Sequence, residues 1–222
     1  MNKILLSLSL ASVMYGCNAA GREKNPLLQK DYALADTLHY DHTVIDALRE
    51  SISGNISRLT PTMRAVNGAA GLEDALQFEY DVNADNSSEY EKLRAALKKQ
   101  GYLLFKSEEN FGTKPDKYAV LKTNNQFDII KFRATNGANY DITNDSVMRK
   151  LHHLYDKEPF EITGADIDWV EVHLNKLNPA DAMTFANDVY EFCPDLAEQG
   201  TETVENLAAE ILETKQLFLW WD

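Results

Sequence analysis

The side chain with the most reactive chemistry in the C-terminal half of the chain is the thiol of Cys193. A thiol becomes a nucleophile when a base lies beside it, and His173, on a predicted strand, is the histidine expected to lie near it. Cys193 also continues a helical stripe formed by Phe185, Ala186 and Val189, and free cysteines are among the most buried residues. The pattern favours a buried structural cysteine, so a hydrolase that uses Cys193 with His173 is the alternative hypothesis.

The segment from Asp81 to Asn86 resembles the opening of a calcium-binding loop, because oxygen-bearing side chains occupy alternate positions. Two positions do not fit such a loop. Asn86 stands where glycine is required, and Lys92 stands where a glutamate should bind calcium with both oxygens. The end of a strand followed by the cap of a helix explains the same residues and is the favoured interpretation.

A second possible metal site lies near the N-terminus, where His39 and His42 would share a helix face with Asp36 and Asp46. Imidazole and carboxylate groups are a plausible set of zinc ligands. A solvated polar face explains these residues as well, and we favour that interpretation. We therefore expect no metal and no cofactor, and a metal-dependent enzyme is the second catalytic alternative.

The best candidate for a binding surface is the predicted strand over residues 167–174. Successive side chains of a strand point to opposite faces, so Trp169, Glu171 and His173 line one face of it. Such a face either binds a ligand or packs against neighbouring strands and a covering helix. Both explanations stay open at this stage.

Two further segments are candidates for the same site. The loop over residues 136–140 is rich in Asn and Gly, which tolerate positive φ, so its backbone N–H groups could hold an anion or a carboxylate. A structural turn between a strand and a helix is the other explanation. The chain ends in two tryptophans and an aspartate. The candidate binding site therefore comprises Asn136, Asn139, Tyr140, Trp169, Glu171, His173, Trp220, Trp221 and Asp222.

The last residues are predicted to form a strand with two apolar sides. Leu217, Leu219 and Trp221 point to one side, and Phe218 and Trp220 point to the other. Burying each large apolar side chain contributes about 1.5–3 kcal/mol. We therefore expect this strand to lie inside a sheet that is covered on both faces.

The N-terminus has the form of a secretory signal, because residues 1–16 join a short positive segment to an apolar stretch too short to span a bilayer. Gly16 directly before Cys17 resembles the lipobox of bacterial lipoproteins, in which the peptide is cut before the cysteine and the cysteine is acylated. This resemblance implies lipidation of Cys17 and a place in the bacterial cell envelope, facing the periplasm or the cell exterior. Residues 17–30 would then be a tether.

The formal net charge is −13, from 22 basic and 35 acidic residues. Nucleic-acid binding needs clustered Lys and Arg, so nucleic acid is not an expected partner. Beyond the N-terminus no apolar run is long enough to span a bilayer, and we expect membrane contact only through the lipid anchor. The expected partner is a protein or a small-molecule ligand whose identity the sequence does not specify.

Hydrophobic periodicity and turn signals predict a helical and irregular segment over residues 31–72, followed by an α+β domain over residues 73–222. Helices and strands do not alternate strictly, so we expect a mixed or mainly antiparallel sheet with helices packed on it. Strands are predicted over 78–82, 102–106, 118–122, 128–133, 160–163 and 167–174, with a turn at Gly164. Helices are predicted before Gly54, after a capping box at Ser88 and Glu91, over 143–156 and from Pro179.

Three motifs in the second half of the chain carry a family resemblance. They are TNGANYD at residues 135–141, YEFCPD at residues 190–195 and LWWD at residues 219–222. Together and in this order they resemble the bacterial family known as domain of unknown function 4253, over roughly residues 102–222. The resemblance implies no activity, because the family has none assigned.

Overall fold

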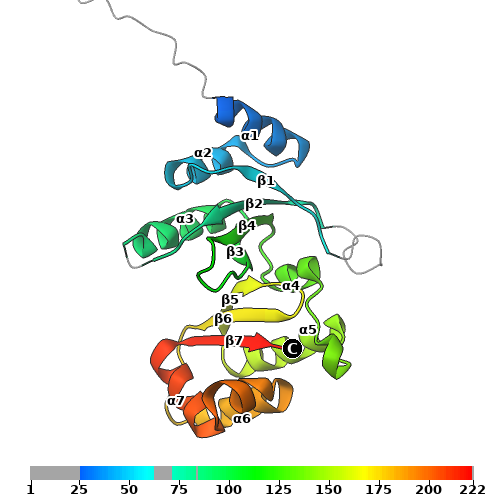
Figure 1. Cartoon of the computed structure of the whole chain (residues 1–222), viewed down its shortest axis with the longest axis vertical. Helices are drawn as coiled ribbons and strands as arrows, with labels where there is room; N and C mark the ends of the chain where they lie inside the picture. Colours follow the sequence, from blue (N-terminus) through cyan, green and yellow to red (C-terminus); the bar gives the residue numbers. More distant parts are fainter. Residues whose placement is uncertain (1–25, 63–71, 84, 222) are drawn as a thin grey trace, which may run out of the picture.

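The computed structural model describes residues 26–62, 72–83 and 85–221. The signal segment, Cys17 and Asp222 lie outside these ranges. The described residues form one mixed seven-stranded sheet with helices packed on it, which confirms the predicted α+β class. Figure 1 shows the strands following one another along the long axis of the molecule, from β1 towards one end to β7 towards the other.

The strands lie in the order β1-β2-β4-β3-β5-β6-β7. Their bounds are β1 (Ile56–Leu59), β2 (Ala75–Tyr80), β3 (Tyr102–Glu108), β4 (Asp116–Lys122), β5 (Phe160–Ala165), β6 (Trp169–Leu174) and β7 (Gln216–Trp220). Neighbouring strands are antiparallel except β3 and β5, which run parallel and meet at the residue pair Lys106 and Gly164. This pair, called the sheet joint below, connects the β1–β4 part to the β5–β7 part.

The helices divide between the two parts of the sheet, with α1 to α3 beside β1–β4 and α4 to α7 beside β5–β7 (Figure 1). Within the described ranges, every helix is too short or too polar to cross a bilayer. The bounds are α1 (Pro26–Thr37), α2 (His42–Ser51), α3 (Ser87–Lys99), α4 (Phe127–Arg133), α5 (Asn144–Lys157), α6 (Ala182–Phe192), α7 (Val204–Thr214), a short 3₁₀ helix η1 (Ala138–Tyr140) and a π-helix η2 (Leu196–Thr201).

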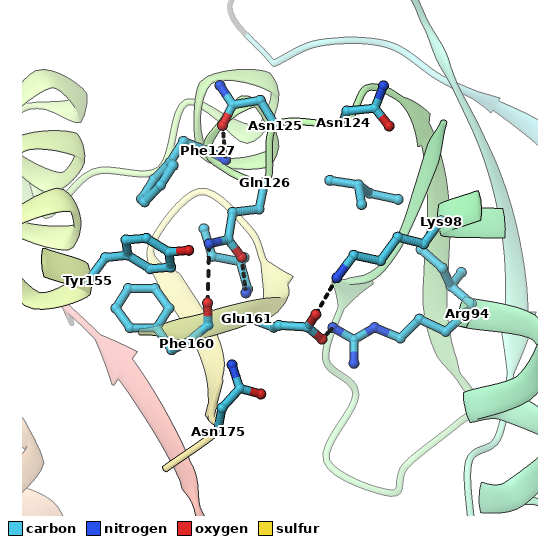
Figure 2. Close-up of a pocket in the computed structure, with 13 residues that line it drawn as sticks. Arg94, Lys98, Asn124, Asn125, Gln126, Phe127, Tyr155, Phe160, Glu161 and Asn175 are labelled. Atoms are coloured by element: carbon cyan, nitrogen blue, oxygen red, sulfur yellow. Dashed lines mark hydrogen bonds and ion pairs between the residues drawn. The ribbon is translucent and has the colours of Figure 1, made fainter. Parts of the chain in front are cut away.

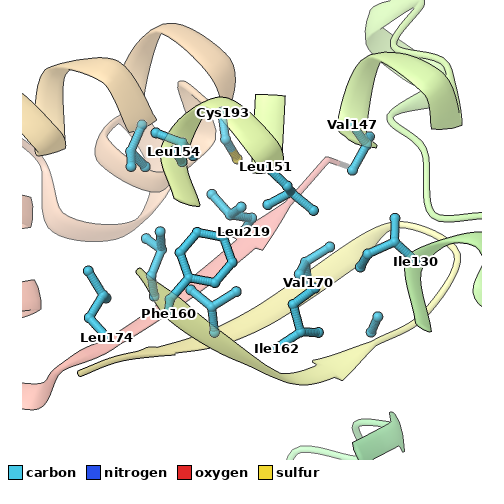
Figure 3. Packing of buried hydrophobic residues seen from close by; sticks show 14 of the residues in the cluster. Ile130, Val147, Leu151, Leu154, Phe160, Ile162, Val170, Leu174, Cys193 and Leu219 are labelled. Carbon is cyan, nitrogen blue, oxygen red and sulfur yellow. The ribbon is translucent and has the colours of Figure 1, made fainter. Parts of the chain in front are cut away.

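Two hydrophobic cores lie on opposite faces of the sheet. On β4, Tyr118 and Val120 belong to the core under α1 to α3, whereas Ala119 and Leu121 belong to the core under α4 to α7. Adjacent strand residues point to opposite faces, so the sheet separates the two cores. Figure 3 shows the second core, in which helical side chains pack on the inner face of β5, β6 and β7.

The outer face of β5–β7 carries no helix of the described chain, and we call it the open face. It presents Trp169, Glu171 and His173 from β6, together with Phe218 and Trp220 from β7. The expectation that the last strand is covered on both faces is therefore wrong. β7 lies at the end of the sheet order, and Phe218 and Trp220 are only half-buried.

Residues 128–133, expected to form a strand, belong to helix α4. Asn125 Oδ1 accepts a hydrogen bond from the backbone N–H of Phe127 at 3.2 Å, so polar side chains before the helix satisfy its first donors. Ile129, Ile130 and Phe132 are all buried. A helix that is buried nearly all round shows no helical period, which is why its pattern resembles that of a strand.

Several boundaries differ from expectation. α1 begins at Pro26, inside the segment suggested as a tether, and β1 lies in the segment expected to be irregular and pairs with β2. α3 begins at Ser87, so Ser88 lies within its first turn and does not cap it. Gly164 is part of β5, and the turn to β6 follows it.

We expect Gly164→Ala to lower the free energy of unfolding by about 1–3 kcal/mol, because overpacking forces neighbouring groups to move. A Cβ at Gly164 would lie 2.8 Å from Cζ3 of Trp169 and 3.1 Å from Cβ of Lys106. Gly54→Ala is the matched control, because a Cβ there would meet no atom within 4 Å. Urea unfolding should show a change within about 1 kcal/mol for the control. Equal stabilities of the two variants would contradict the close packing at the sheet joint.

Candidate functional site

Aromatic side chains occupy one end of the open face. Trp169 stacks on Phe218 with ring centroids 5.2 Å apart, and Phe218 lies 6.0 Å from Trp220. Phe111, on the loop between β3 and β4, is 79% exposed. A cavity of about 530 Å³ lies among these rings, and its lining residues are Glu109, Phe111, Asp168, Trp169, Phe218, Trp220 and Trp221. This end of the open face offers an apolar contact surface that the described residues do not fill.

A cluster of charges occupies the middle of the open face. Lys106 Nζ lies 2.6 Å from Glu109 and 3.0 Å from Glu171, and Thr163 donates a hydrogen bond to Glu171 at 2.7 Å. Burial disfavours the charge on Lys106, but the hydrogen bonds to Glu109 and Glu171 outweigh burial and raise its pKa. Burial raises the pKa of the neighbouring Asp116. Lys106 therefore stays charged and holds its carboxylate partners in place, so it is not suited to act as a base.

The open face is negatively charged. A second cavity, of about 740 Å³, continues from the charge cluster towards α3 and includes His173. The two cavities of the open face are lined by six carboxylates, Glu91, Glu109, Asp116, Glu161, Asp168 and Glu171, and by two cationic side chains, Arg94 and Lys106. The excess of carboxylates favours a cationic ligand.

The three motifs that suggested a family meet around Trp221, in what we call the terminal junction. Trp221 is 2% exposed, and a Cβ on Gly137 would lie 2.8 Å from its ring. The thiol of Cys193 donates to the carbonyl oxygen of Trp220 at 2.8 Å, and the Tyr140 hydroxyl donates to the Asp195 carboxylate at 2.7 Å. Each motif therefore holds another in place, and the terminal junction is a packing unit.

The loop over residues 136–140 is a hydrogen-bonded turn in which several of the backbone N–H groups expected to hold an anion have partners in the chain. The backbone N–H of Asn136 donates to Ile167 O at 2.7 Å, that of Gly137 to Ile142 O at 2.9 Å, and that of Tyr140 to Gly137 O at 2.9 Å. These donors are therefore unavailable to a ligand. Asn139 is exposed on the 3₁₀ helix η1 and forms no side-chain hydrogen bond with the described residues.

The predicted binding residues thus separate into two groups. The structure brings Trp169, Glu171, His173 and Trp220 together on the open face. Asn136, Tyr140 and Trp221 serve the terminal junction and its surrounding turn, and Asp222 lies outside the described residues. Sequence reasoning missed two contributors to the open face, Phe111 and Lys106. The sequence did indicate Phe111, because a large apolar residue within an Asn-Phe-Gly turn is expected to be exposed.

The structure does not bring Cys193 and His173 together. Cys193 is fully buried among the side chains of the core that packs on the inner face of β5–β7 (Figure 3). His173 is exposed on the open face, so the sheet lies between the two side chains. Burial raises the pKa of the Cys193 thiol to about 11. A thiol in this state is not a nucleophile at neutral pH.

The polar groups between β2 and α3 bind one another. Asn83 Oδ1 accepts hydrogen bonds from the backbone N–H of Asp85 at 3.0 Å and of Asn86 at 3.3 Å, and Asn86 Nδ2 donates to Asp81 O at 2.7 Å. These bonds shape the turn that enters α3. They account for the oxygen-rich spacing that resembles a calcium loop.

The candidate zinc residues lie on α1, on α2 and, for His39, in the turn between them, and they pair locally. His42 Nε2 lies 2.8 Å from Asp36 Oδ1, and the His42 ring stacks on Tyr32 at 4.3 Å. Asp46 accepts a hydrogen bond from the Tyr32 hydroxyl, and the His39 carbonyl accepts one from Lys122 at 2.6 Å. Among the described residues, no three His, Cys, Asp or Glu side chains are grouped as metal ligands.

The structure defines an α+β domain with a partly exposed aromatic and acidic face and, within the described residues, no base paired with Cys193. Residues 117–222 match the family described as domain of unknown function (DUF4253), and this part of the chain belongs to that family. The match begins in β4, later than the expected start at residue 102. Comparisons with curated proteins and with solved structures gave no match.

We expect the Cys193 thiol to be protected in the native protein. In a Cys17→Ser variant, which leaves Cys193 as the remaining thiol, reaction with a disulfide reagent at pH 8 should be at least about 100-fold slower than in urea, because the native thiolate population is small. Absorbance of the released thiol measures both rates. Fast reaction in the native state would restore the hydrolase hypothesis.

Proposed function

We propose that this chain is a lipid-anchored extracytoplasmic binding domain whose open face takes an extended, positively charged segment of a partner protein. The observation that carries the proposal is the half-buried aromatic surface of Phe218 and Trp220, which lies beside the buried Trp169 ring, with the exposed Phe111 at its border. An exposed group of large apolar side chains beside charged ones is typical of an interaction site.

The charge of the open face supports a cationic partner. Its two cavities have more carboxylates than cationic groups, and the whole chain has a net charge of −13. The charged end of a Lys or Arg side chain can bind a carboxylate. Its aliphatic part can pack on an aromatic ring, and its charge can interact with the face of that ring. A segment that alternates basic and apolar residues matches both the aromatic end and the charge cluster.

The same geometry gives less support to catalysis. The carboxylates in the charge cluster are held by Lys106, and Cys193 lies on the other side of the sheet from His173. A general base must reach the proton that it removes, and a nucleophile needs such a base beside it. Among the described residues, Cys193 has no such base beside it, so the arrangement of Cys193 and His173 does not support the hydrolase hypothesis.

Binding is tested with two ten-residue peptides, one alternating Arg and Leu and the other alternating Glu and Leu. We expect the basic peptide to change the tryptophan fluorescence of the protein and the acidic peptide to leave it unchanged. Phe111→Ala and Trp220→Ala should each weaken binding by about tenfold, since aromatic contacts dominate interface energies.

Met183→Ala is the matched control, because Met183 is 39% exposed on α6, away from the open face. Its affinity for the basic peptide should equal that of the unchanged protein. Raising the salt from 0.05 to 0.5 M should weaken binding by screening the carboxylates. The proposal is wrong if the two peptides bind equally or if neither binds.

Anchoring is tested separately by expressing the full chain and the Cys17→Ser variant in a bacterium. We expect the unchanged protein to enter the detergent phase on Triton X-114 partition and the variant to remain in the aqueous phase, because several acyl chains on one residue anchor stably. Aqueous partition of both proteins would remove the anchor from the proposal without affecting the peptide test.

A further inference from the structure

A cavity opens where the sheet divides. β3 and β5 meet at Lys106 and Gly164, and before this sheet joint their first residues are not paired with each other. The side-chain amide of Gln126 occupies part of the space along β5. Its Nε2 donates to Phe160 O at 3.2 Å, and its Oε1 accepts from Ile162 N at 2.8 Å. Gln126 thus takes the hydrogen-bonding place of a neighbouring strand, and a cavity of about 330 Å³ remains beside it (Figure 2).

One wall of this cavity, which we call the gap cavity, is aromatic. The Tyr155 ring lies 5.6 Å from Phe127 and 5.3 Å from Phe160, and both contacts are edge-to-face. Figure 2 shows the Tyr155 hydroxyl directed into the cavity. That hydroxyl forms no hydrogen bond with the described part of the chain. The wall therefore combines an apolar ring surface with one free donor.

The rim of the gap cavity is rich in amides. Asn124 and Asn175 lie on opposite sides of it in Figure 2. Both side chains are exposed, and neither forms a hydrogen bond with the described residues. An amide can donate and accept at the same time, so two facing amides can bind neighbouring hydroxyl groups of one molecule.

The charged groups that line the gap cavity, Arg94, Lys98 and Glu161, are paired with one another. Glu161 binds Arg94 Nη2 at 2.9 Å and also pairs with Lys98. Glu91, which lies outside the lining, is 3.9 Å from Arg94 Nη1 and offsets the second positive charge. Because each cation already has a carboxylate partner, the lining offers hydrogen-bond donors and acceptors to an uncharged ligand.

We propose that the gap cavity binds an uncharged, polyhydroxylated small molecule of monosaccharide size. The aromatic wall would face the apolar side of the sugar ring, and the amides and the Arg94–Glu161 pair would bind its hydroxyl groups. The cavity volume lies at the lower end of the range for small-molecule sites, which suits a compact ligand. This site does not depend on the peptide surface, although Arg94, Glu161 and Asn175 border both.

The test uses glucose, galactose and N-acetylglucosamine as neutral probes, with benzoate and benzylammonium as charged probes of similar size. Saturation-transfer NMR identifies which probes bind, and isothermal titration measures the affinity. We expect at least one monosaccharide to bind the full chain with a Kd of about 1 mM or tighter. Asn124→Ala and Tyr155→Phe should each weaken that binding at least fivefold, since each removes one hydrogen-bonding group.

Asn187→Ala is the matched control, because Asn187 is an exposed asparagine on α6, remote from the gap cavity. It should leave sugar binding unchanged. Circular dichroism melting should show that all three variants are folded, as each change lies at the surface or only removes a hydroxyl. Failure of every monosaccharide to bind, stronger binding of a charged probe, or binding by Tyr155→Phe and Asn124→Ala as tight as that of the unchanged protein would each overturn the proposal. None of these results would alter the outcome of the peptide titration, so the two proposals can fail separately.

Discussion

The contact between Lys106 and Gly164 is the constraint on which both candidate surfaces depend. The missing side chain of Gly164 lets β3 and β5 meet, because the Trp169 ring and the stem of Lys106 already fill the space beside it. The two strands are otherwise unpaired, which leaves the gap cavity on one side of the contact. On the open face, the ammonium of Lys106 reaches Glu171 and connects β3 to β6. One close approach between two strands therefore produces the cavity and also orients the charge cluster.

Local sequence patterns predicted many of the helices and strands. The remaining features depend on which distant elements pack together, and local patterns do not show that. α5 has an apolar stripe of Val147, Leu151 and Leu154 that only a helix can bury on one side, so its identity followed from the sequence. α4 was mistaken for a strand because burial on nearly every side removes that stripe. The candidate site could be predicted only in part, because a local pattern assigns residues to a face but does not show what packs on that face. Alternation along β6 placed Trp169 and Glu171 on one face, but it could not show whether a helix covers them.

The terminal junction gives a packing role to residues whose types suggest chemistry. A cysteine, a tyrosine, an asparagine-rich turn and two tryptophans suggest chemistry when they are read separately. In the structure, Tyr140 binds Asp195, the Cys193 thiol binds a backbone carbonyl, and the Trp221 ring lies against Gly137. Buried polar groups are costly unless they have partners, and these partners come from segments far apart in the sequence. The three motifs therefore serve packing in this chain. The open face lies beside them, and its rings from β7 stay partly exposed.

The family match ends at the last residue but starts inside the sheet, at residue 117 in β4. Both neighbours of β4, which are β2 and β3, come from the preceding part of the chain, and β3 is also the neighbour of β5. A fragment cut at the start of the match would carry β4 with two bare edges and would have lost the strand that joins it to β5. Bare edges recruit other chains. The sheet is therefore longer than the part of it that sequence comparison recognises, because β1, β2 and β3 all precede the matched residues.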